Sequence, residues 1–429
     1  MVVTSAKELA QALESKTEII EIEGKITGSP SITLPVGTTL VGKDGAELEF
    51  KAKGVRLTSG NTIKNLTINT LDYEVAIYND TTVEDGGTIV LENVTTSGQI
   101  YIAVENAQKG MRVEATDVWV KSADVRGRSE QPHGFGVDVL QGAFTLWNRS
   151  ADPNTKFTAT LEGIRIGQAD KPVRGSGIFV DGYTDRDGKL TGGSFTADLI
   201  ETREIYTDGG ISQGTPDKIS AGVFVLGGAT VQRVENNAEI TTHGANDMVL
   251  DLWGHTPKWV ANAPITSHGA SGIGFVNFGQ MGVLEINAPI VTNGLGARGF
   301  NVYDGTVESA KFESITTHGD GAIGIQISKP VGTIEVSGDV RTTGGTGMSL
   351  VKGVQMELQA NGVSVKPGAV IENLTLAGTV ATAGENLVSF EVSEGAKINH
   401  LNIGKLEASG AGSRIHNIEG DIPTDALPE

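Results

Sequence analysis

The sequence of 429 residues contains no cysteine and few aromatic residues (5%), and no run of apolar residues comes near the ~18 that a membrane-spanning helix needs. Without cysteine the chain has no disulfide, no thiolate nucleophile and no zinc–sulfur site. Basic residues are outnumbered, since 33 Lys and Arg stand against 52 Asp and Glu for a net charge of −19. This charge, with no basic run, argues against nucleic acid and membrane surfaces as partners.

The start of the chain, MVVTSAKELAQALESK, also lacks the basic and apolar regions of a secretory signal. The cytoplasm is therefore the default location, although a chain whose signal had been removed would look the same and would be secreted. Ser5 and Glu8 have the spacing of a capping box. A helix that begins there would gather four small or apolar side chains on one face: Ala6, Leu9, Ala10 and Leu13.

Glycine, in contrast, is abundant, with 58 residues, about twice its ordinary share. Many glycines recur at a fixed spacing of 25 residues. The segments TTHG, TSHG, VTNG, TTHG and RTTG end at Gly244, Gly269, Gly294, Gly319 and Gly344. A fixed period of this length indicates a repeat architecture, which overrides the expectation of two or three separate domains from length alone.

Rows of 25 residues align side chains of one kind in columns. One apolar column reads Ile240, Ile265, Ile290, Ile315 and Val340, and a hydroxyl column reads Thr242, Ser267, Thr292, Thr317 and Thr342. A second apolar column reads Val225, Leu250, Phe275, Phe300, Ile325 and Leu350, and an amide column reads Asn237, Asn262 and Asn287. β-Branched and aromatic residues alternate with small or polar ones, which is typical of strands. We expect coils of short strands that stack with ~4.8 Å between parallel neighbours.

The columns, the Asn stack and the opening segment resemble the right-handed parallel β-helix proteins of the pectin-lyase-like group. The resemblance implies an all-β fold over residues 1–429: a single right-handed parallel β-helix, a solenoid of ~25-residue coils with a short N-terminal capping helix. It carries no catalytic motif. By analogy with the group it also implies a homo-oligomer, with a trimer as one form.

The regularity of the pattern divides the predicted solenoid. Residues 1–16 form the helical cap, 115–220 hold polar, Gly/Pro-rich insertions, 221–355 form the regular coils, and 411–429 form a C-terminal tail. The insertions are expected to be loops beside the coils.

Strand parity predicts which side chains of the regular coils point outward. One outward column holds Asp251, Asn301 and Gln326, and another holds three aromatic residues, Trp253, Phe278 and Tyr303. Flat rings beside polar groups suit the binding of sugars. Asp304, which follows Tyr303 at the strand end, is expected to be a further sugar ligand at the rim of this face. The alternative is that an insertion, the tail or a neighbouring copy covers this ridge.

Three acidic residues are expected on the same face: Asp138, Asp181 and Asp251. Asp181 and Asp251 would lie two coils apart, with backbones ~9.6 Å apart. Carboxylates at ~6.5–9.5 Å suit an inverting glycosidase, in which one acts as acid and one as base. The alternatives are solvated carboxylates or a calcium cluster. No other metal and no organic cofactor is indicated.

Two further features leave their roles open. His133, Gln141 and Trp147 form a mixture of ring and polar groups beside Asp138, either as substrate ligands or as a packed loop. Arg298 interrupts an apolar column, so it is either buried in an ion pair, exposed by a bulge, or functional.

The functional prediction is a carbohydrate-active solenoid that binds, and with its acids cleaves or rearranges, a neutral oligosaccharide or polysaccharide. Whether it is an enzyme stays open between a glycoside hydrolase, a glycan lyase or a transferase. The alternative is a non-catalytic carbohydrate-binding or structural solenoid that oligomerises.

Overall fold

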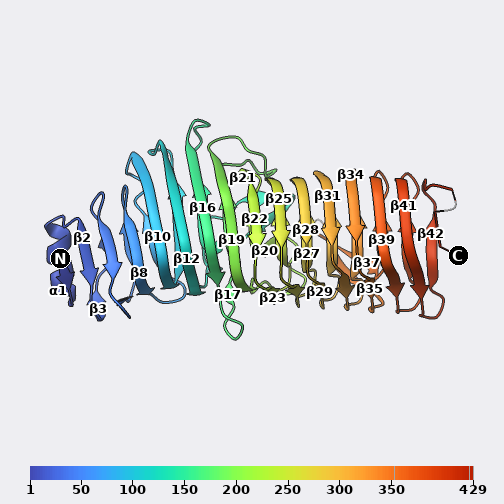
Figure 1. Cartoon of the computed structure of the whole chain (residues 1–429), viewed down its shortest axis with the longest axis horizontal. Coiled ribbons are helices and arrows are strands. Elements are labelled where there is room, and N and C mark those ends of the chain that lie inside the picture. Colours follow the sequence, from blue (N-terminus) through green and yellow to red (C-terminus); the bar gives the residue numbers. More distant parts are fainter. Residues whose placement is uncertain (352, 425, 429) are drawn as a thin grey trace. The chain divides into compact units, whose positions relative to one another are not determined.

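The computed structural model describes residues 1–351, 353–424 and 426–428. In this part of the chain there is one helix, and long sheets of mostly parallel strands make up most of the rest, which confirms the all-β class and is consistent with a solenoid (Figure 1). The chain forms two compact units. The first comprises Met1–Gly134, Leu140–Thr207 and Val225–Gln232, and the second comprises Phe135–Val139, Asp208–Phe224 and Arg233–Glu429.

The first unit begins with helix α1 (Ala6–Glu14). The capping box is confirmed in part, because Ser5 Oγ accepts a hydrogen bond from the Glu8 backbone N–H at 3.3 Å, while the Glu8 carboxylate accepts from the Thr4 N–H at 2.7 Å. The hydrogen bonds from the Thr4 N–H and the Thr4 hydroxyl lower the pKa of Glu8. The buried face consists of Leu9 and Ala12. The predicted face was therefore wrong at Ala10, which is exposed.

Two series of strands make up most of the first unit. The first series consists of β1 (Val2–Val3), β2 (Ile19–Ile22), β3 (Lys25–Ser29), β5 (Thr39–Gly42), β6 (Glu47–Phe50), β8 (Thr62–Asn69), β10 (Asp85–Ser97), β12 (Gly110–Ser122), β16 (Lys156–Ile166), β17 (Val173–Arg174), β19 (Ser194–Asp208) and β21 (Ala229–Val231). The second consists of β4 (Ile32–Thr33), β7 (Val55–Leu57), β9 (Val75–Asn79), β11 (Gln99–Val104), β15 (Gly142–Asn148) and β18 (Ser176–Asp181), and β13 (His133–Gly134) is a short strand outside both.

The second unit also contains two series of strands. Its first series consists of β22 (Arg233–Asn236), β23 (Ile240–Thr242), β25 (His255–Ala261), β26 (Ile265–Ser267), β28 (Gln280–Ile286), β29 (Ile290–Thr292), β31 (Thr306–Phe312), β32 (Ile315–Thr317), β34 (Val331–Val336), β35 (Val340–Thr342), β39 (Val370–Thr382) and β41 (Lys397–Ala408). Its second consists of β24 (Asp247–Leu252), β27 (Ile273–Asn277), β30 (Arg298–Val302), β33 (Ile323–Ile327), β38 (Val363–Val365), β40 (Val388–Val392) and β42 (Arg414–Ile418). β14 (Val137–Val139) pairs in parallel with β20 (Lys218–Val225).

The register of the strands confirms that equivalent residues of successive coils are neighbours. Leu250 pairs with Phe275, and Phe275 pairs with Phe300, and all three side chains have no exposed surface. The amide column is also a ladder, in which Asn262 Nδ2 donates to Asn237 Oδ1 at 2.8 Å and Asn287 Nδ2 donates to Asn262 Oδ1 at 3.0 Å. Like side chains therefore stack on like, because each coil repeats the backbone path of the one before it.

The apolar column does not continue to Leu350, and this part of the prediction was wrong. Ile325 pairs instead with Val363, and two of the strands between them leave the coil as an antiparallel hairpin, β36 (Thr346–Val351) and β37 (Val354–Gln359). Gly353 has a φ of 79°, which fits the tight turn between these strands. The spacing of glycines continues to Gly344, so the period gave no sign that the next coil is interrupted.

Four strands of the second series of the second unit are buried on both of their faces. Every residue of β24, β27, β30 and β33 is buried, including the outward-pointing side chains. Strands buried on both faces require another layer of chain over the outer one. Within the described residues, no helix has the length and hydropathy needed to cross a bilayer.

Candidate functional site

The aromatic residues predicted to lie on one face stack along the coils. Trp253, Phe278 and Tyr303 follow the ends of β24, β27 and β30, because the 25-residue period places them at the same point of each coil. The ring centroids of Trp253 and Phe278 are 6.0 Å apart, and those of Phe278 and Tyr303 are 5.3 Å apart. The predicted ridge is therefore present.

A segment from the insertion covers this ridge. The ring of Phe135 lies 5.0 Å from that of Trp253, edge to face, and 4.5 Å from that of Phe278. Trp253 and Tyr303 are each only 6% exposed. Of the two interpretations offered by the sequence, the covered ridge is the one that the structure has, and an open aromatic platform along these coils is excluded in this conformation.

The hairpin β36–β37 covers the adjoining part of the same face. Ser349 Oγ accepts from Arg298 Nη1 at 2.7 Å and donates to the carbonyl of Gly296 at 2.8 Å. The Leu350 N–H donates to Ser271 Oγ at 3.1 Å. These bonds come from β36 and hold the hairpin against the residues at the starts of β27 and β30.

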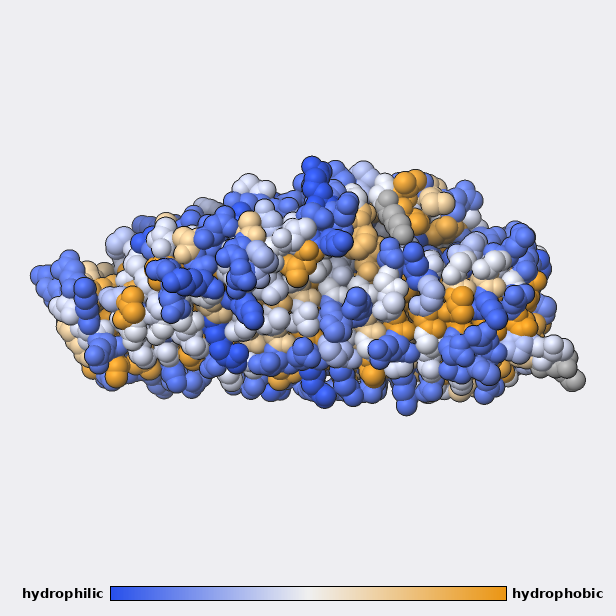
Figure 2. Space-filling model, turned by 90° about the horizontal axis from the view of Figure 1, so that it is seen from above, coloured by the Kyte–Doolittle hydropathy of each residue, from blue (hydrophilic) through white to orange (hydrophobic). Residues whose placement is uncertain are grey.

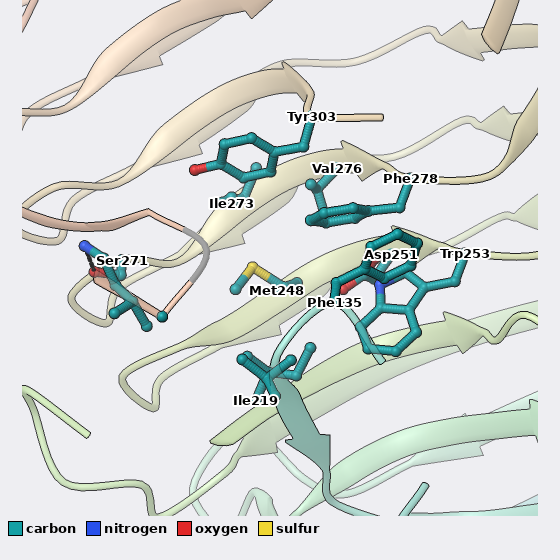
Figure 3. A pocket seen from close by; sticks show the side chains of 13 residues that line it. Phe135, Ile219, Met248, Asp251, Trp253, Ser271, Ile273, Val276, Phe278 and Tyr303 are labelled. Atoms are coloured by element: carbon teal, nitrogen blue, oxygen red, sulfur yellow. Dashed lines mark hydrogen bonds between the residues drawn. The ribbon is translucent and has the colours of Figure 1, made fainter. Parts of the chain in front are cut away.

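Between these layers lies a partly enclosed cavity of about 50 Å³ (Figure 3). At ~10–15 Å³ for each water, this space holds a few water molecules or a group of a few heavy atoms. Most of the lining is aromatic and aliphatic, and its members with rings, sulfur or charge are Phe135, Met248, Asp251, Trp253, Phe278 and Tyr303. Figure 3 shows Asp251 next to the indole of Trp253, with the rings of Phe135 and Phe278 beside them.

Asp251 is the acidic group of the cavity, and it is 1% exposed. Burial raises its pKa well above the usual range, and the approach of the Trp253 indole opposes this shift. This approach does not amount to a well-formed hydrogen bond, because neither Asp251 Oδ1 nor Trp253 Nε1 has a hydrogen-bond partner among the described residues. Buried polar atoms without partners are rare, because each loses its bonds to water without replacement.

Asn301 and Gln326, the other polar members of the outward column, are also buried. Asn301 has no exposed surface, and both its amide oxygen and its amide nitrogen are without partners in the described part of the chain. Gln326 is 6% exposed and accepts from Arg298 Nε at 3.4 Å. Asp304 is half-buried at the strand end and forms an ion pair with Lys329 at 3.3 Å.

Arg298 is buried, and among the described residues it has no carboxylate partner. The interpretation of Arg298 as part of a buried ion pair was therefore wrong. Its guanidinium instead donates to Ser349, Gln326 and the Gly296 carbonyl, and it lies 5.7 Å from the centroid of the Tyr303 ring. Its Nη2 has no partner in the described region. Arg298 therefore anchors the hairpin.

Asp181 belongs to the first unit and ends β18. Its side chain is completely buried, and Oδ1 accepts from the N–H groups of Gly182 at 2.8 Å and Gly228 at 3.0 Å. Desolvation raises the pKa of Asp181 to about 8, although both backbone bonds oppose the shift. Asp181 thus holds a turn together. Because Asp251 lies in the other unit, the pairing of the two carboxyl groups stays a prediction.

The cluster expected around Asp138 is divided between the two units. Gln141 and Trp147 lie in the first, where Gln141 is 1% and Trp147 8% exposed. Gln141 Nε2 donates to the Glu130 carbonyl at 2.7 Å, and Trp147 Nε1 donates to the carbonyl of Gly182 at 3.2 Å. These contacts fit the packed-loop interpretation.

The remaining two members of that cluster are half-buried. His133 lies in β13 of the first unit, and Asp138 lies in β14 of the second, where its strand pairs with β20. In the described residues no three or more His, Cys, Asp or Glu side chains are grouped so as to hold a metal ion. Calcium binding stays untested.

The sequence did not single out several residues that shape the cavity, above all Phe135, Met248 and Ser271. Phe135 has a φ of 50°, which is uncommon for a bulky residue, and it lies between two glycines. An aromatic residue between two glycines in an insertion could have indicated a ring that packs on another part of the chain. The local sequence does not indicate which part of the chain that ring contacts.

Comparisons with protein-family models, with curated proteins and with solved structures found no match to this chain.

Proposed function

We propose that the protein is a right-handed parallel β-helix of the pectin-lyase-like kind that binds a carbohydrate and does not cleave it. One observation carries the proposal: stacked aromatic rings line a partly enclosed cavity together with Asp251 and Trp253, each of which has an unpartnered polar atom. Sugars combine apolar C–H faces with hydroxyl groups, so rings next to unpaired donors and acceptors suit them.

The burial of the acidic residues favours binding over hydrolysis. An inverting glycosidase needs one carboxyl group at the leaving oxygen and a second that activates a water. Asp181 is fully enclosed and accepts two backbone hydrogen bonds, and Asp251 is 1% exposed. Asp181 is engaged by the backbone and Asp251 meets only a small group that enters the partly enclosed cavity, so this arrangement disfavours the acid and base that hydrolysis of a glycosidic bond needs.

The test is a binding and turnover panel on the full chain. Neutral and uronic mono- and oligosaccharides are titrated by calorimetry, with and without calcium, and the same mixtures are analysed for products. We expect binding of a neutral sugar or a sugar derivative without products. Phe278→Ala should weaken binding because Phe278 lines the cavity, whereas Asn399→Ala, at a half-exposed amide of β41, should not. Product formation, or a panel in which nothing binds, would refute the proposal.

A second candidate is a structural solenoid that forms homo-oligomers. Three residues of the hairpin are exposed apolar side chains: Met348 (44%), Val354 (59%) and Met356 (46%). The face of the molecule seen in Figure 2 is mainly hydrophilic, with hydrophobic residues gathered in small patches. Sedimentation of the wild type and of Val354→Ser distinguishes this candidate, which predicts an oligomer that the substitution weakens. A monomer at all concentrations would refute it.

A further inference from the structure

The size of the cavity restricts what enters it. A volume of about 50 Å³ accommodates a group of a few heavy atoms. A whole sugar ring with its hydroxyl groups is larger than this, so the ring of a bound sugar would stay at the mouth and only a substituent would pass inside. The chemistry of the walls then decides which substituent that is.

The walls favour a small cation. Four aromatic residues line the cavity, namely Phe135, Trp253, Phe278 and Tyr303. Aromatic rings attract ammonium groups, by ~2 kcal/mol or more where water is excluded. A hydroxymethyl group gains nothing comparable from these rings, and the net charge of −19 opposes the approach of a carboxylate.

The unpartnered carboxyl oxygen supplies the specific contact. Asp251 is buried, and its Oδ1 has no hydrogen-bond partner among the described residues. An ammonium N–H donates well to a carboxylate, and such charge-assisted bonds are short and strong. Arg298 does not neutralise Asp251 by a hydrogen bond, because its guanidinium lies 5.7 Å from the centroid of the Tyr303 ring and donates to Ser349 and Gln326.

We propose that this cavity binds the ammonium group of an organic cation, with Asp251 as counter-ion and the aromatic residues as its walls. The ammonium site itself does not depend on the function proposed above. The expected class of ligand, an amino sugar, rests on that function because it takes the rest of the ligand to be a sugar. Binding forms no covalent bond. Burial raises the pKa of Asp251, whereas a bound cation favours its ionised form, so any proton on the carboxyl group is released to the solvent when the cation binds.

The experiment compares probes that separate the cation from the sugar. Glucosamine, glucose, methylammonium and tetramethylammonium are titrated into the full chain by calorimetry. Gly353 lines the cavity, and its neighbour Lys352 lies outside the described residues, so each titration is repeated with Lys352→Met to remove an ammonium of the chain itself. We expect glucosamine to bind at least about tenfold more tightly than glucose, and the simple ammonium ions to bind measurably.

Variants then test the roles of the residues. Asp251→Asn keeps the shape of the side chain and should remove the preference for glucosamine, and Phe278→Leu should weaken every cation. Asp44→Asn, at an exposed turn, should change neither. Thermal unfolding and circular dichroism of each variant establish that it folds. If Asp251→Asn does not fold, the effect of Phe278→Leu on cation binding still decides the test.

Each pattern of binding leads to a definite conclusion. Equal affinity for glucose and glucosamine would overturn the cation site and leave the carbohydrate proposal intact. Binding of the simple ammonium ions with no binding of any sugar would support the cation site and refute the carbohydrate proposal. Cation binding that survives Asp251→Asn overturns the inference, and so does the absence of cation binding in both the wild type and Lys352→Met.

Discussion

Replacing Asp181 by asparagine should change how the stability of the protein depends on pH. In the folded chain Asp181 is fully buried, and its Oδ1 accepts from the N–H groups of Gly182 and Gly228. Asparagine has the same shape, and its amide oxygen can accept the same two bonds. Its amide nitrogen replaces Oδ2, which has no partner among the described residues. The substitution therefore removes a titrating proton and little else.

The magnitude follows from the difference in pKa between the folded and unfolded states. Burial raises the pKa of Asp181 to about 8, whereas an aspartate in an unfolded chain titrates near ~3.9. Between these values the folded state binds one proton more than the unfolded state. The free energy of unfolding therefore falls by ~1.4 kcal/mol for each pH unit in this window. The stabilisation from the protonated group is complete below about pH 4 and is lost as the pH rises toward 8, a total on the order of 5 kcal/mol.

Urea denaturation at pH 5 and pH 8 measures this effect. Other titrating groups are the same in both proteins, so the change between the two pH values should differ by about 4 kcal/mol, with Asp181→Asn gaining stability relative to wild type at pH 8. Asp44→Asn, at an exposed turn, serves as the matched control and should follow the wild type. If wild type and Asp181→Asn lose stability in parallel, the carboxyl group is not held protonated in the fold and the reasoning fails.

Three substitutions test the stacked coils by denaturation or thermal unfolding. Phe300→Ala should lower the free energy of unfolding by about 3–5 kcal/mol, because it empties a fully buried site beside the rings of Phe275 and Phe312. A loss below about 1 kcal/mol would contradict the packed column. Gly299→Ala should lower the melting temperature, because a Cβ there would collide with the side chain of Ile315. Gly127→Ala is the control, since a Cβ there meets no neighbouring atom, and it should leave the melting temperature unchanged. Equal effects of the two substitutions would argue against the close approach of Gly299 to Ile315. Asn262→Ala removes two hydrogen bonds of the exposed amide ladder and should lower the free energy of unfolding by only about 0.5–1 kcal/mol. A much larger loss would mean that the ladder stabilises parts of the fold beyond the turn in which it lies.

Part of the candidate site was predictable from the sequence because it belongs to the repeat. The period of 25 residues and the parity of strands placed Asp251, Trp253 and Asn301 on the outward face, and the structure brings them to that face. The same rules could not predict their burial. Phe135 comes from a distant insertion, and nothing in its local sequence specifies the rings on which it packs.

The sequence by itself determined the repeating strands and the identity of the stacked columns, from Leu250 through Phe275 to Phe300. It could do so because backbone path, turn glycines and side-chain alternation are local properties that repeat with the period. Only the tertiary structure decided that the hairpin of 346–359 leaves the coil and that the ridge is enclosed. These outcomes depend on contacts between segments far apart in the chain, and the free energy of such contacts leaves no period in the sequence.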